Sequence, residues 1–479
     1  MRSRIMLSVT LCLFVLGATS AVAETVAGLP VHIDKINEKA IRVWIGDTIS
    51  STNTVAIATE EGLIIIDTLG LPEVDRELRA IIARELGRDD FKYLINTHEH
   101  GDHVGGNGIY ADCTIVGHEL VAASMTGRDE HRQGVVDWLT RRIAEQETEL
   151  TQLESGSPEA TRMQEDLAHN RLELTAAEAN AKPFPPTKTF TDRMTLDCGD
   201  TTFELYYIGG MHSASDIAVW VPEHGLLMTG DTMADTWLTD TPGCLASFMA
   251  RSGIPHDFPL WLENWNHLLA KKNEIELILP GHWNGELSYA GAEARVKYVE
   301  TLWTATNKAY KSGEDMDYML AEYQLASHFP ELVDSPGFSA RNNYSTVVEM
   351  WVECSGQESA ARAIYALVDE GGEKSAVQNL VATHGTPSSP YYFSEGEFNA
   401  LGYQFLQTDR ADQAVVLFRI NAKLYPESWN VYDSLGEGLL ATGARDEAIA
   451  MYERSLELNP ESPSGLDALE RIRHEDSVN

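Results

Sequence analysis

The sequence of 479 residues is poor in basic side chains. Lysine and arginine together number 36, against 73 aspartate and glutamate residues, so the formal net charge is −37 at pH 7. A field this negative repels phosphate backbones, which excludes nucleic acid as the expected substrate or partner. The charge bears on partners and solubility, and it does not indicate a fold.

Cysteine is also scarce, and long apolar runs are missing from most of the chain. The five cysteines lie far apart in the sequence, and we predict no disulfide from them. Beyond residue 23, no segment is long and apolar enough to be expected to cross a bilayer. The mature chain is therefore expected not to insert into a membrane.

The N-terminal segment is the one apolar run of note. Arg2 and Arg4 precede a mostly apolar stretch from Ile5 to Gly17, and Ala21-Val22-Ala23 supplies a small-x-small cleavage pattern. This order predicts a secretory signal peptide over residues 1–23, with an uncleaved anchor as the alternative. Cleavage would remove two arginines and no acidic residue, taking the charge from −37 to −39. We expect a secreted, periplasmic protein.

The chain is too long for one ordinary domain, and its apolar pattern alternates between strands and helices. Expected strands at Thr54–Ala58 and Leu63–Ile66 precede a helix that opens at Leu71-Pro72, and a strand follows at Tyr93–Ile95. The order recurs with strands at Phe203–Ile208, Ile217–Val221, Leu226–Thr229 and Ile275–Leu279 and a helix at Pro259–Lys271. Two β-rich halves with outer helices predict a layered α/β sandwich, which we place at residues 24–355.

The stretch 126–182 between the two halves differs in composition. It is rich in Glu, Gln, Ala, Leu and Arg, and it is broken at Ser155-Gly156-Ser157-Pro158. We predict two antiparallel helices that end before Pro183-Phe184-Pro185-Pro186, because proline blocks further helix. Its charge favours a solvated face, and a lid is the alternative.

Residues 356–393 are interpreted as a connector, and residues 394–479 contain an internal repeat. Six positions recur 34 residues apart: Leu401-Gly402, Ala414, Phe418, Leu424 and Pro426 return as Leu435-Gly436, Ala448, Tyr452, Leu458 and Pro460. This is the tetratricopeptide period, with small and aromatic residues where two helices pack closely. Two repeats are too few to stand alone, so we expect them to pack on the rest of the chain, to bind a protein partner or to dimerise.

The segment Asn96–Asn107 carries the densest group of metal-ligand side chains. His98, His100, Asp102 and His103 fall within six residues, directly after an expected strand. A strand projects alternate residues to one side, so His98 and His100 are expected to share one metal. A turn beyond Gly101 would let Asp102 and His103 face a second metal. Imidazole and carboxylate ligands suit zinc, with iron or manganese as alternatives.

This His-x-His-x-Asp-His pattern resembles the metallo-β-lactamase superfamily, and the resemblance covers about residues 30–285. The family's remaining motifs occur in the expected order, each after an expected strand, with Asp67 before this pattern and His212, Asp231 and His282 after it. The implied fold is a metallo-β-lactamase αββα sandwich, here with an inserted helical hairpin and a C-terminal helical region resembling tetratricopeptide repeats.

The resemblance also implies a ligand set. In it His98, His100 and His212 bind one metal, Asp102, His103 and His282 bind the other, and Asp231 bridges the two. Asp67 is expected behind the ligands rather than among them. Two zinc ions per chain are expected, with a metal-bridging hydroxide as nucleophile. Asp102 would in addition orient that hydroxide or pass a proton to the leaving group.

The implied activity is hydrolysis of an ester, lactone, thioester or β-lactam bond in a small-molecule substrate. Asp231 stands where the best-known secreted β-lactamases carry cysteine, which also admits carboxylate-bridged thioesterases, lactonases and sulfatases. One alternative is an alkyl sulfatase-like sulfuric ester hydrolase, suggested by the helical insertion and by Asn343-Tyr344-Ser345-Thr346. Another is a tetratricopeptide interaction protein with a vestigial metal site, against which the complete ligand set argues.

Four tryptophans lie between Asp231 and the residue after His282. Core packing is expected for Trp261 and Trp265. For Trp237 and Trp283, packing in the core and a wall of the substrate pocket remain equal alternatives.

Overall fold

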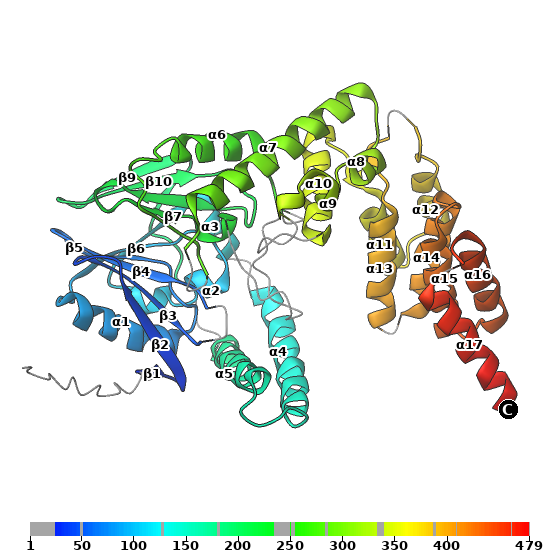
Figure 1. The fold of residues 1–479 in the computed structure, drawn as a ribbon, viewed down its shortest axis with the longest axis horizontal. Helices are drawn as coiled ribbons and strands as arrows, with labels where there is room; N and C mark the ends of the chain where they lie inside the picture. Colours follow the sequence, from blue (N-terminus) through cyan, green and yellow to red (C-terminus); the bar gives the residue numbers. More distant parts are fainter. Residues whose placement is uncertain are drawn as a thin grey trace, which may run out of the picture. The chain divides into compact units, whose positions relative to one another are not determined.

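The computed structural model describes residues 24–47, 51–125, 129–179, 183–233, 250, 254–282, 286–332, 340–386, 389–408, 410–460 and 462–478. The chain divides into two compact units (Figure 1): Met1–Phe190, Asp197–Thr201 and Gly281–Asn284 form the first, and Thr191–Leu196, Thr202–Pro280 and Gly285–Asn479 the second. The predicted signal peptide lies outside the described residues. Within them, every helix is too short or too polar to span a bilayer.

The first unit is built on a mixed sheet of eight strands that follow one another in chain order. Strands β1 to β5 pair antiparallel, whereas β5 to β8 pair parallel. Their bounds are β1 Thr25–Val26, β2 Leu29–Lys35, β3 Ala40–Ile45, β4 Thr54–Thr59, β5 Gly62–Ile66, β6 Phe91–Ile95, β7 Thr114–His118 and β8 Lys188–Phe190. A parallel pair needs a crossover connection, and helix α1 (Pro72–Leu86) supplies it between β5 and β6.

Helix α1 forms where the sequence predicts a helix. Proline occupies its first turn, and Gly87 ends it in the left-handed conformation at φ 68°. Leu78 and Ile82, one turn apart, are buried in the same core cluster as the strand residues Ile65 and Leu94. Short helices follow β6 and β7: α2 (Gly101–Val104), η1 (Asn107–Tyr110) and α3 (Glu119–Met125).

Two long helices occupy the inserted segment, α4 (Asp129–Leu150) and α5 (Pro158–Ala179). They are joined to each other by polar contacts. The amide of Asn170 donates to Gln146 at 2.8 Å, and the guanidinium of Arg171 donates to Glu147 at 2.6 Å. A hairpin of two helices thus stands where the composition predicts one.

The second unit contains a mixed sheet of five strands in the order β13-β12-β11-β10-β9. Strands β10 to β12 pair antiparallel, and β12 pairs parallel with β13. The bounds are β9 Arg193–Asp197, β10 Thr202–Tyr207, β11 Ile217–Val221, β12 Leu226–Met228 and β13 Leu277–Leu279, with η2 Pro222–His224 and η3 Gly230–Met233 between them. The predicted strands are therefore present, with bounds that differ by at most two residues.

Helix α6 (Phe258–Leu269) packs on this sheet. Trp261 and Trp265 on α6 are fully buried, in one cluster with Trp220 of β11 and Leu227 of β12. The prediction that both α6 tryptophans are core residues is confirmed. Trp237 and Trp283 lie outside the described residues.

In its described residues the rest of the second unit is mostly helical, and it includes the stretch 356–393 that we interpreted as a connector. The bounds are α7 Tyr289–Ser312, α8 Met316–Glu322, α9 Leu325–His328, η4 Pro330–Leu332, α10 Ala340–Ser355, β14 Glu358–Ser359, α11 Ala360–Asp369, α12 Lys374–Val381 and β15 Tyr391–Tyr392. Helices α11 and α12 lie in that stretch. Ala360, Ala361 and Ile364 of α11 are buried together with Phe393 and with Phe398, which lies beyond residue 393, so the stretch shares a core with the segment that follows it.

The described residues beyond Phe393 contain five helices: α13 Glu395–Gln407, α14 Ala411–Leu424, α15 Trp429–Ala441, α16 Arg445–Leu458 and α17 Pro463–Val478. The repeat seen in the sequence recurs as a repeated contact. A Cβ on Gly402 would lie 2.3 Å from the ring of Phe418, and one on Gly436 would lie 3.0 Å from the ring of Tyr452. Glycine at these two positions lets consecutive helices approach closely.

Candidate metal centre

Three of the predicted ligands converge within the first unit. One ligand atom from each of Asp102, His103 and His282 lies within 4.8 Å of the others. The Nε2 atoms of His103 and His282 are 3.2 Å apart, and Asp102 Oδ2 is 3.1 Å from His282 Nε2. The side chain of His103 is fully buried, whereas that of Asp102 is 40% exposed. The group therefore has a buried base and one side open to solvent.

The local fold explains how residues so far apart in sequence meet. Helix α2 starts at Gly101, so its single turn carries Asp102 and His103. His282 follows β13 and forms an isolated β-bridge with Thr52, and the amide of Asn53 donates to the carbonyl of Gly281 at 2.7 Å. The loop before β4 thus holds the His282 segment in the first unit.

His98 and His100 lie in the loop between β6 and α2. His98 Nε2 is 3.0 Å from His100 Nδ1, and the ring of His98 lies 4.1 Å from that of His103 between centroids. We expected strand alternation to place His98 and His100 on one side. That explanation is wrong, because β6 ends at Ile95 and both histidines belong to the loop. Bends in the loop bring the two rings together instead.

Asp67 stands behind His103, as expected. Its Oδ2 lies 2.8 Å from His103 Nδ1 and accepts from the hydroxyl of Thr97 at 2.6 Å, while its Oδ1 accepts from the amide of Thr97 at 2.8 Å. An ionised carboxylate only accepts, so His103 donates from Nδ1 and presents Nε2 to the ligand group. Asp67 is 1% exposed and has φ 56°, a left-handed conformation that aspartate tolerates better than most residues.

Close backbone contact keeps the Asp67 loop against helix α2. A Cβ on Gly70 would lie 2.4 Å from the carbonyl oxygen of Gly101 and 2.5 Å from Cα of Asp102, and Gly70 has φ 73°. Any side chain at this position would push the loop away from α2. Glycine is therefore required for Asp67 to reach His103.

Two asparagines tie the ends of the ligand loop together. Asn96 and Asn107 exchange a pair of side-chain amide hydrogen bonds of 3.0 and 2.9 Å, and both side chains are fully buried. Asn107 also donates to the carbonyl of Phe184 at 2.9 Å. From the sequence we assigned these asparagines no role, although they are the first and last residues of the ligand segment.

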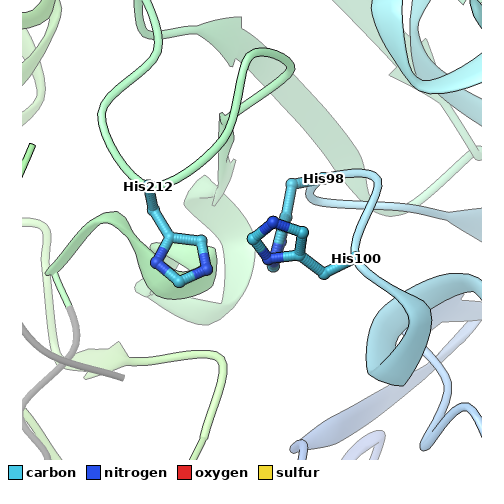
Figure 2. A group of neighbouring side chains, drawn as sticks. All are labelled: His98, His100 and His212. Carbon is cyan, nitrogen blue, oxygen red and sulfur yellow. The ribbon is translucent and has the colours of Figure 1, made fainter. Parts of the chain in front are cut away.

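The second unit carries the two other predicted ligands. His212 Nε2 is 3.3 Å from Asp231 Oδ2, and both side chains are 3% exposed. Figure 2 draws His212 on its loop, together with His98 and His100 on theirs. Asp231 lies in η3, directly after β12, so the expectation that it follows a strand is confirmed.

The His212 loop is organised by Asp216, a residue that we did not single out from the sequence. One oxygen of Asp216 accepts from the backbone amides of Met211, His212 and Ser213 at 2.8, 2.8 and 3.0 Å, and the other accepts from the hydroxyl of Ser213 at 2.6 Å. Four hydrogen bonds to one buried carboxylate fix the backbone from which His212 projects. The spacing Ser213-x-x-Asp216 is the sequence feature that could have indicated this contact.

The chemistry of the donor set fits a divalent metal such as zinc. Neutral imidazole nitrogens and carboxylate oxygens are the usual protein ligands of zinc. Here such atoms lie close together in groups of three residues, most of them buried. The first unit contributes His98, His100, Asp102, His103 and His282, and the second contributes His212 and Asp231.

Comparisons with known proteins identify the superfamily of the domain that contains these residues. Residues 47–282 match the family model described as the Metallo-beta-lactamase superfamily, a range that includes all seven predicted ligands and Asp67. The chain is 25% identical over 281 residues to the 2,4-dinitroanisole O-demethylase subunit alpha of Nocardioides sp. (strain JS1661), covering 58% of this chain and 65% of that protein. It is 25% identical over 124 residues to the type 2 metallo-beta-lactamase of Bacteroides fragilis, covering 26% of this chain and 44% of that protein.

Among solved structures, the stereoselective inverting sec-alkylsulfatase Pisa1 from Pseudomonas sp. matches with a TM-score of 0.47 and 13% identity, covering 91% of this chain and 66% of that one. The chain spans less than two thirds of the length of both curated relatives named above. Homologues in the metallo-β-lactamase superfamily are metal-dependent hydrolases, which agrees with the activity class predicted from the sequence.

Proposed function

Because the chain contains a metallo-β-lactamase superfamily domain, an α/β sandwich with mixed sheets followed by a large helical region, we propose that it is a binuclear metal hydrolase of small molecules. The proposed bond is an ester, lactone, thioester or β-lactam. The observation that carries the proposal is the group Asp102, His103 and His282, in which Asp67 fixes the metal-facing nitrogen of His103.

In this proposal the ligands of the two units form one centre. His98, His100 and His212 hold the first ion, Asp102, His103 and His282 hold the second, and Asp231 is shared. Two facts support this joining. The family match spans all seven residues, and a buried carboxylate holds one ligand in each unit, Asp67 for His103 in the first and Asp216 for His212 in the second. We propose zinc as the native metal, with iron and manganese as the alternatives to be tested.

Bound metal ions would supply a Lewis acid and an acidified water nucleophile. The chain's own residues perform the remaining tasks. Asp67 keeps His103 in one tautomer, so Nε2 is available without reorganisation. Asp216 holds the amide of His212 and thereby its side-chain direction. Asp102 supplies the one carboxylate of the group Asp102, His103 and His282, and its side chain is 40% exposed, which suits it to orient the water or to carry a proton to the leaving group.

Alkyl sulfate hydrolysis is the alternative function. Residues of helix α10 that suggested it form hydrogen bonds within the protein. Asn343 accepts from the hydroxyl of Tyr298 at 2.9 Å and donates to the carbonyl of Tyr323 at 2.9 Å. The hydroxyl of Ser345 donates to the carbonyl of Ala250, also at 2.9 Å. These bonds account for Asn343 and Ser345 without a substrate, so we place esters, lactones, thioesters and β-lactams before alkyl sulfates.

Export and the C-terminal repeats belong to the proposal as well. The N-terminal pattern of charge, apolar run and small residues supports secretion to the periplasm. The paired contacts of Gly402 with Phe418 and Gly436 with Tyr452, 34 residues apart, support tetratricopeptide-like packing. We propose that this region binds a protein partner or a second copy of the chain.

Metal analysis of protein purified without chelator tests the central proposal. We expect about two equivalents of transition metal per chain, from the count of ligands. The loaded protein is then assayed against nitrocefin, a lactone, a thioester, an alkyl sulfate and 2,4-dinitroanisole. Protein that stays metal-free in excess zinc would refute the proposal, and turnover of the sulfate alone would establish the runner-up.

A further inference from the structure

The loop that carries His212 is held at its start by the segment that leads into helix α6. The amide of Asp257 donates to the carbonyl of Gly209 at 2.7 Å. A Cβ on Gly209 would lie 2.7 Å from the carbonyl oxygen of Asp257, and one on Gly210 would lie 2.7 Å from that of Pro255. Both glycines have positive φ, 87° and 69°. Only glycine therefore allows the two backbones to pack this closely just before the ligand.

His256 belongs to the same segment and contacts the loop, helix α6 and helix α10. Its Nδ1 lies 3.4 Å from the carbonyl oxygen of Gly210, and its ring stacks on that of Phe258 with 5.2 Å between the centroids. Its Nε2 lies 3.7 Å from Oε2 of Glu349 on α10. A carbonyl and an ionised carboxylate only accept hydrogen bonds, so the two contacts favour an imidazolium with a proton on each nitrogen. The ring is thus oriented from both of its nitrogens.

The carbonyl of Gly210 and the amide of Met211 belong to one peptide group. Its amide donates to Asp216 at 2.8 Å, and its carbonyl oxygen faces His256. The group is therefore held at both ends, directly before the ligand His212. Rotation of this peptide group would change the direction in which the His212 backbone starts.

The pair of His256 and Glu349 is buried, with side chains 3% and 7% exposed. Both charges have lost most of their water, so such a pair adds little stability over an apolar pair of similar volume. An apolar pair would fill the space, but it would not hold the carbonyl of Gly210. What the ion pair supplies is therefore a fixed direction for that carbonyl.

Helix α10 contacts the same stretch of chain at a second point. The hydroxyl of Ser345 donates to the carbonyl of Ala250 at 2.9 Å, in addition to the contact of Glu349 with His256. Ser345 and Glu349 are four residues apart and so lie on one face of the helix. All of these residues belong to the second unit, as does His212. One face of α10 therefore holds the chain that supports the ligand.

We propose that Glu349 and His256 position the metal ligand His212, so that helix α10 belongs to the support of the metal centre. The inference rests on the proposed function, because it adds positioning residues to the centre proposed there. Glu349 orients His256, and His256 fixes the peptide group before the ligand. Both residues act on the first ion through His212.

Zinc binding to the full chain tests the inference with the double variant His256→Phe/Glu349→Leu. Phenylalanine can keep the stack on Phe258, and the apolar pair leaves no buried charge unpaired. We expect the affinity for one zinc equivalent to fall about 10-fold and the affinity for the other to stay within about twofold, as competition with a chromophoric chelator would measure. The urea midpoint of the metal-free variant should stay close to that of the intact chain. The visible absorption of the cobalt-loaded variant should shift, because it reports the geometry of the ligands.

His256→Phe alone is the second variant. Glu349 lines a cavity of about 450 Å³, where water can solvate its carboxylate, so this variant should fold and show the same selective loss. Glu353→Leu is the matched control, because it removes the same charge from an exposed position one turn further along α10. It should bind both equivalents as the intact chain does.

A further substitution separates positioning from a general loosening of the fold. In a chain that carries His212→Ala, the change His256→Phe should weaken zinc binding no further, because its effect passes through His212. An additional loss in that chain, or unchanged affinities in His256→Phe alone, would overturn the inference and leave the metal centre established. An intact chain that binds no zinc would instead refute the proposed function, and the inference with it.

Discussion

The substitution Asp67→Asn tests how much the residue behind His103 contributes to metal binding. Asparagine has nearly the same shape, tolerates the positive φ of this position and can still accept from the amide of Thr97. Its side chain must then turn an NH₂ group toward His103 Nδ1, which itself donates to Asp67 in the native protein. Two donors cannot face each other, so His103 is driven to the tautomer with its proton on Nε2.

That tautomer blocks the nitrogen that faces Asp102 and His282. Loss of such a supporting carboxylate typically lowers metal affinity 10- to 100-fold, or about 1.4 to 2.8 kcal/mol. The metal-free protein should lose less, about 1 to 2 kcal/mol, because the bond from the Thr97 amide survives and the bond to His103 is kept with its direction reversed. We therefore expect a selective loss of one equivalent of bound zinc with the fold retained.

Competition with a chromophoric zinc chelator measures the affinities of both equivalents, and urea unfolding of metal-free protein measures stability. Asp75→Asn is the matched control. Asp75 is also a buried aspartate of the first unit, but its carboxylate accepts from the backbone amides of Leu69 and Leu71 and contacts no ligand. Wild-type affinity for both zinc equivalents in Asp67→Asn, within about twofold, would contradict the role assigned to Asp67.

Three further outcomes follow from the structure. Asp231→Ala should lower turnover by at least about 100-fold and change the free energy of unfolding of the metal-free protein by less than about 2 kcal/mol, as kinetics and urea titration would show. Wild-type turnover on any good substrate would exclude Asp231 as the shared ligand. Burial raises the pKa of Asp75 to about 7 from 3.8, so the folded state binds its proton more tightly than the unfolded state, and the free energy of unfolding should fall as pH rises from about 4 to about 7. Asp75→Asn should flatten that dependence in metal-free protein, and an unchanged pH profile would refute it. Truncation before Pro390 should lower the melting temperature measured by calorimetry, because it removes Phe393 and Phe398 from the core around α11; an unchanged melting temperature would show that the C-terminal helices are an independent unit.

Elements with a strong periodic pattern could be predicted from the sequence. The strand Ile217–Val221 has the expected bounds because a β-branched, apolar run is followed at once by Pro222. The helix that opens at Pro72 was recognisable from its proline and from apolar residues at helical spacing. In both places local propensity and burial favour the same structure.

Helices α11 and α12 show where such reasoning failed. We interpreted the stretch 356–393 as a connector because it is rich in serine, glycine and proline. We gave less weight to a short amphipathic pattern that indicates a helix. The signal was present: the hydroxyl of Ser359 accepts from the amide of Arg362 at 3.1 Å, an N-cap, and Ala360, Ala361 and Ile364 follow on the buried face. A cap followed by small apolar residues predicts a helix even in a polar segment.

For the metal centre, residue types were predictable and supporting contacts were only partly so. Dense histidine and aspartate spacing indicates ligands because few other roles need those side chains together. The partner of His103 could be anticipated through the family resemblance. The partner of the His212 loop could not, since Asp216 acts through backbone amides, and any residue supplies those.

The two supporting carboxylates lower the free energy needed to order the ligands of the proposed centre. Asp67 fixes a ligand side chain in the first unit, and Asp216 fixes a ligand backbone in the second. Metal binding then needs little local ordering within either unit, so less of its free energy is spent on immobilising side chains. If the ligands of both units form one centre as proposed, the remaining cost of metal binding is that of bringing the residues of the two units together. Bound metal would then stabilise the folded chain by mass action, in proportion to the logarithm of its free concentration above the dissociation constant.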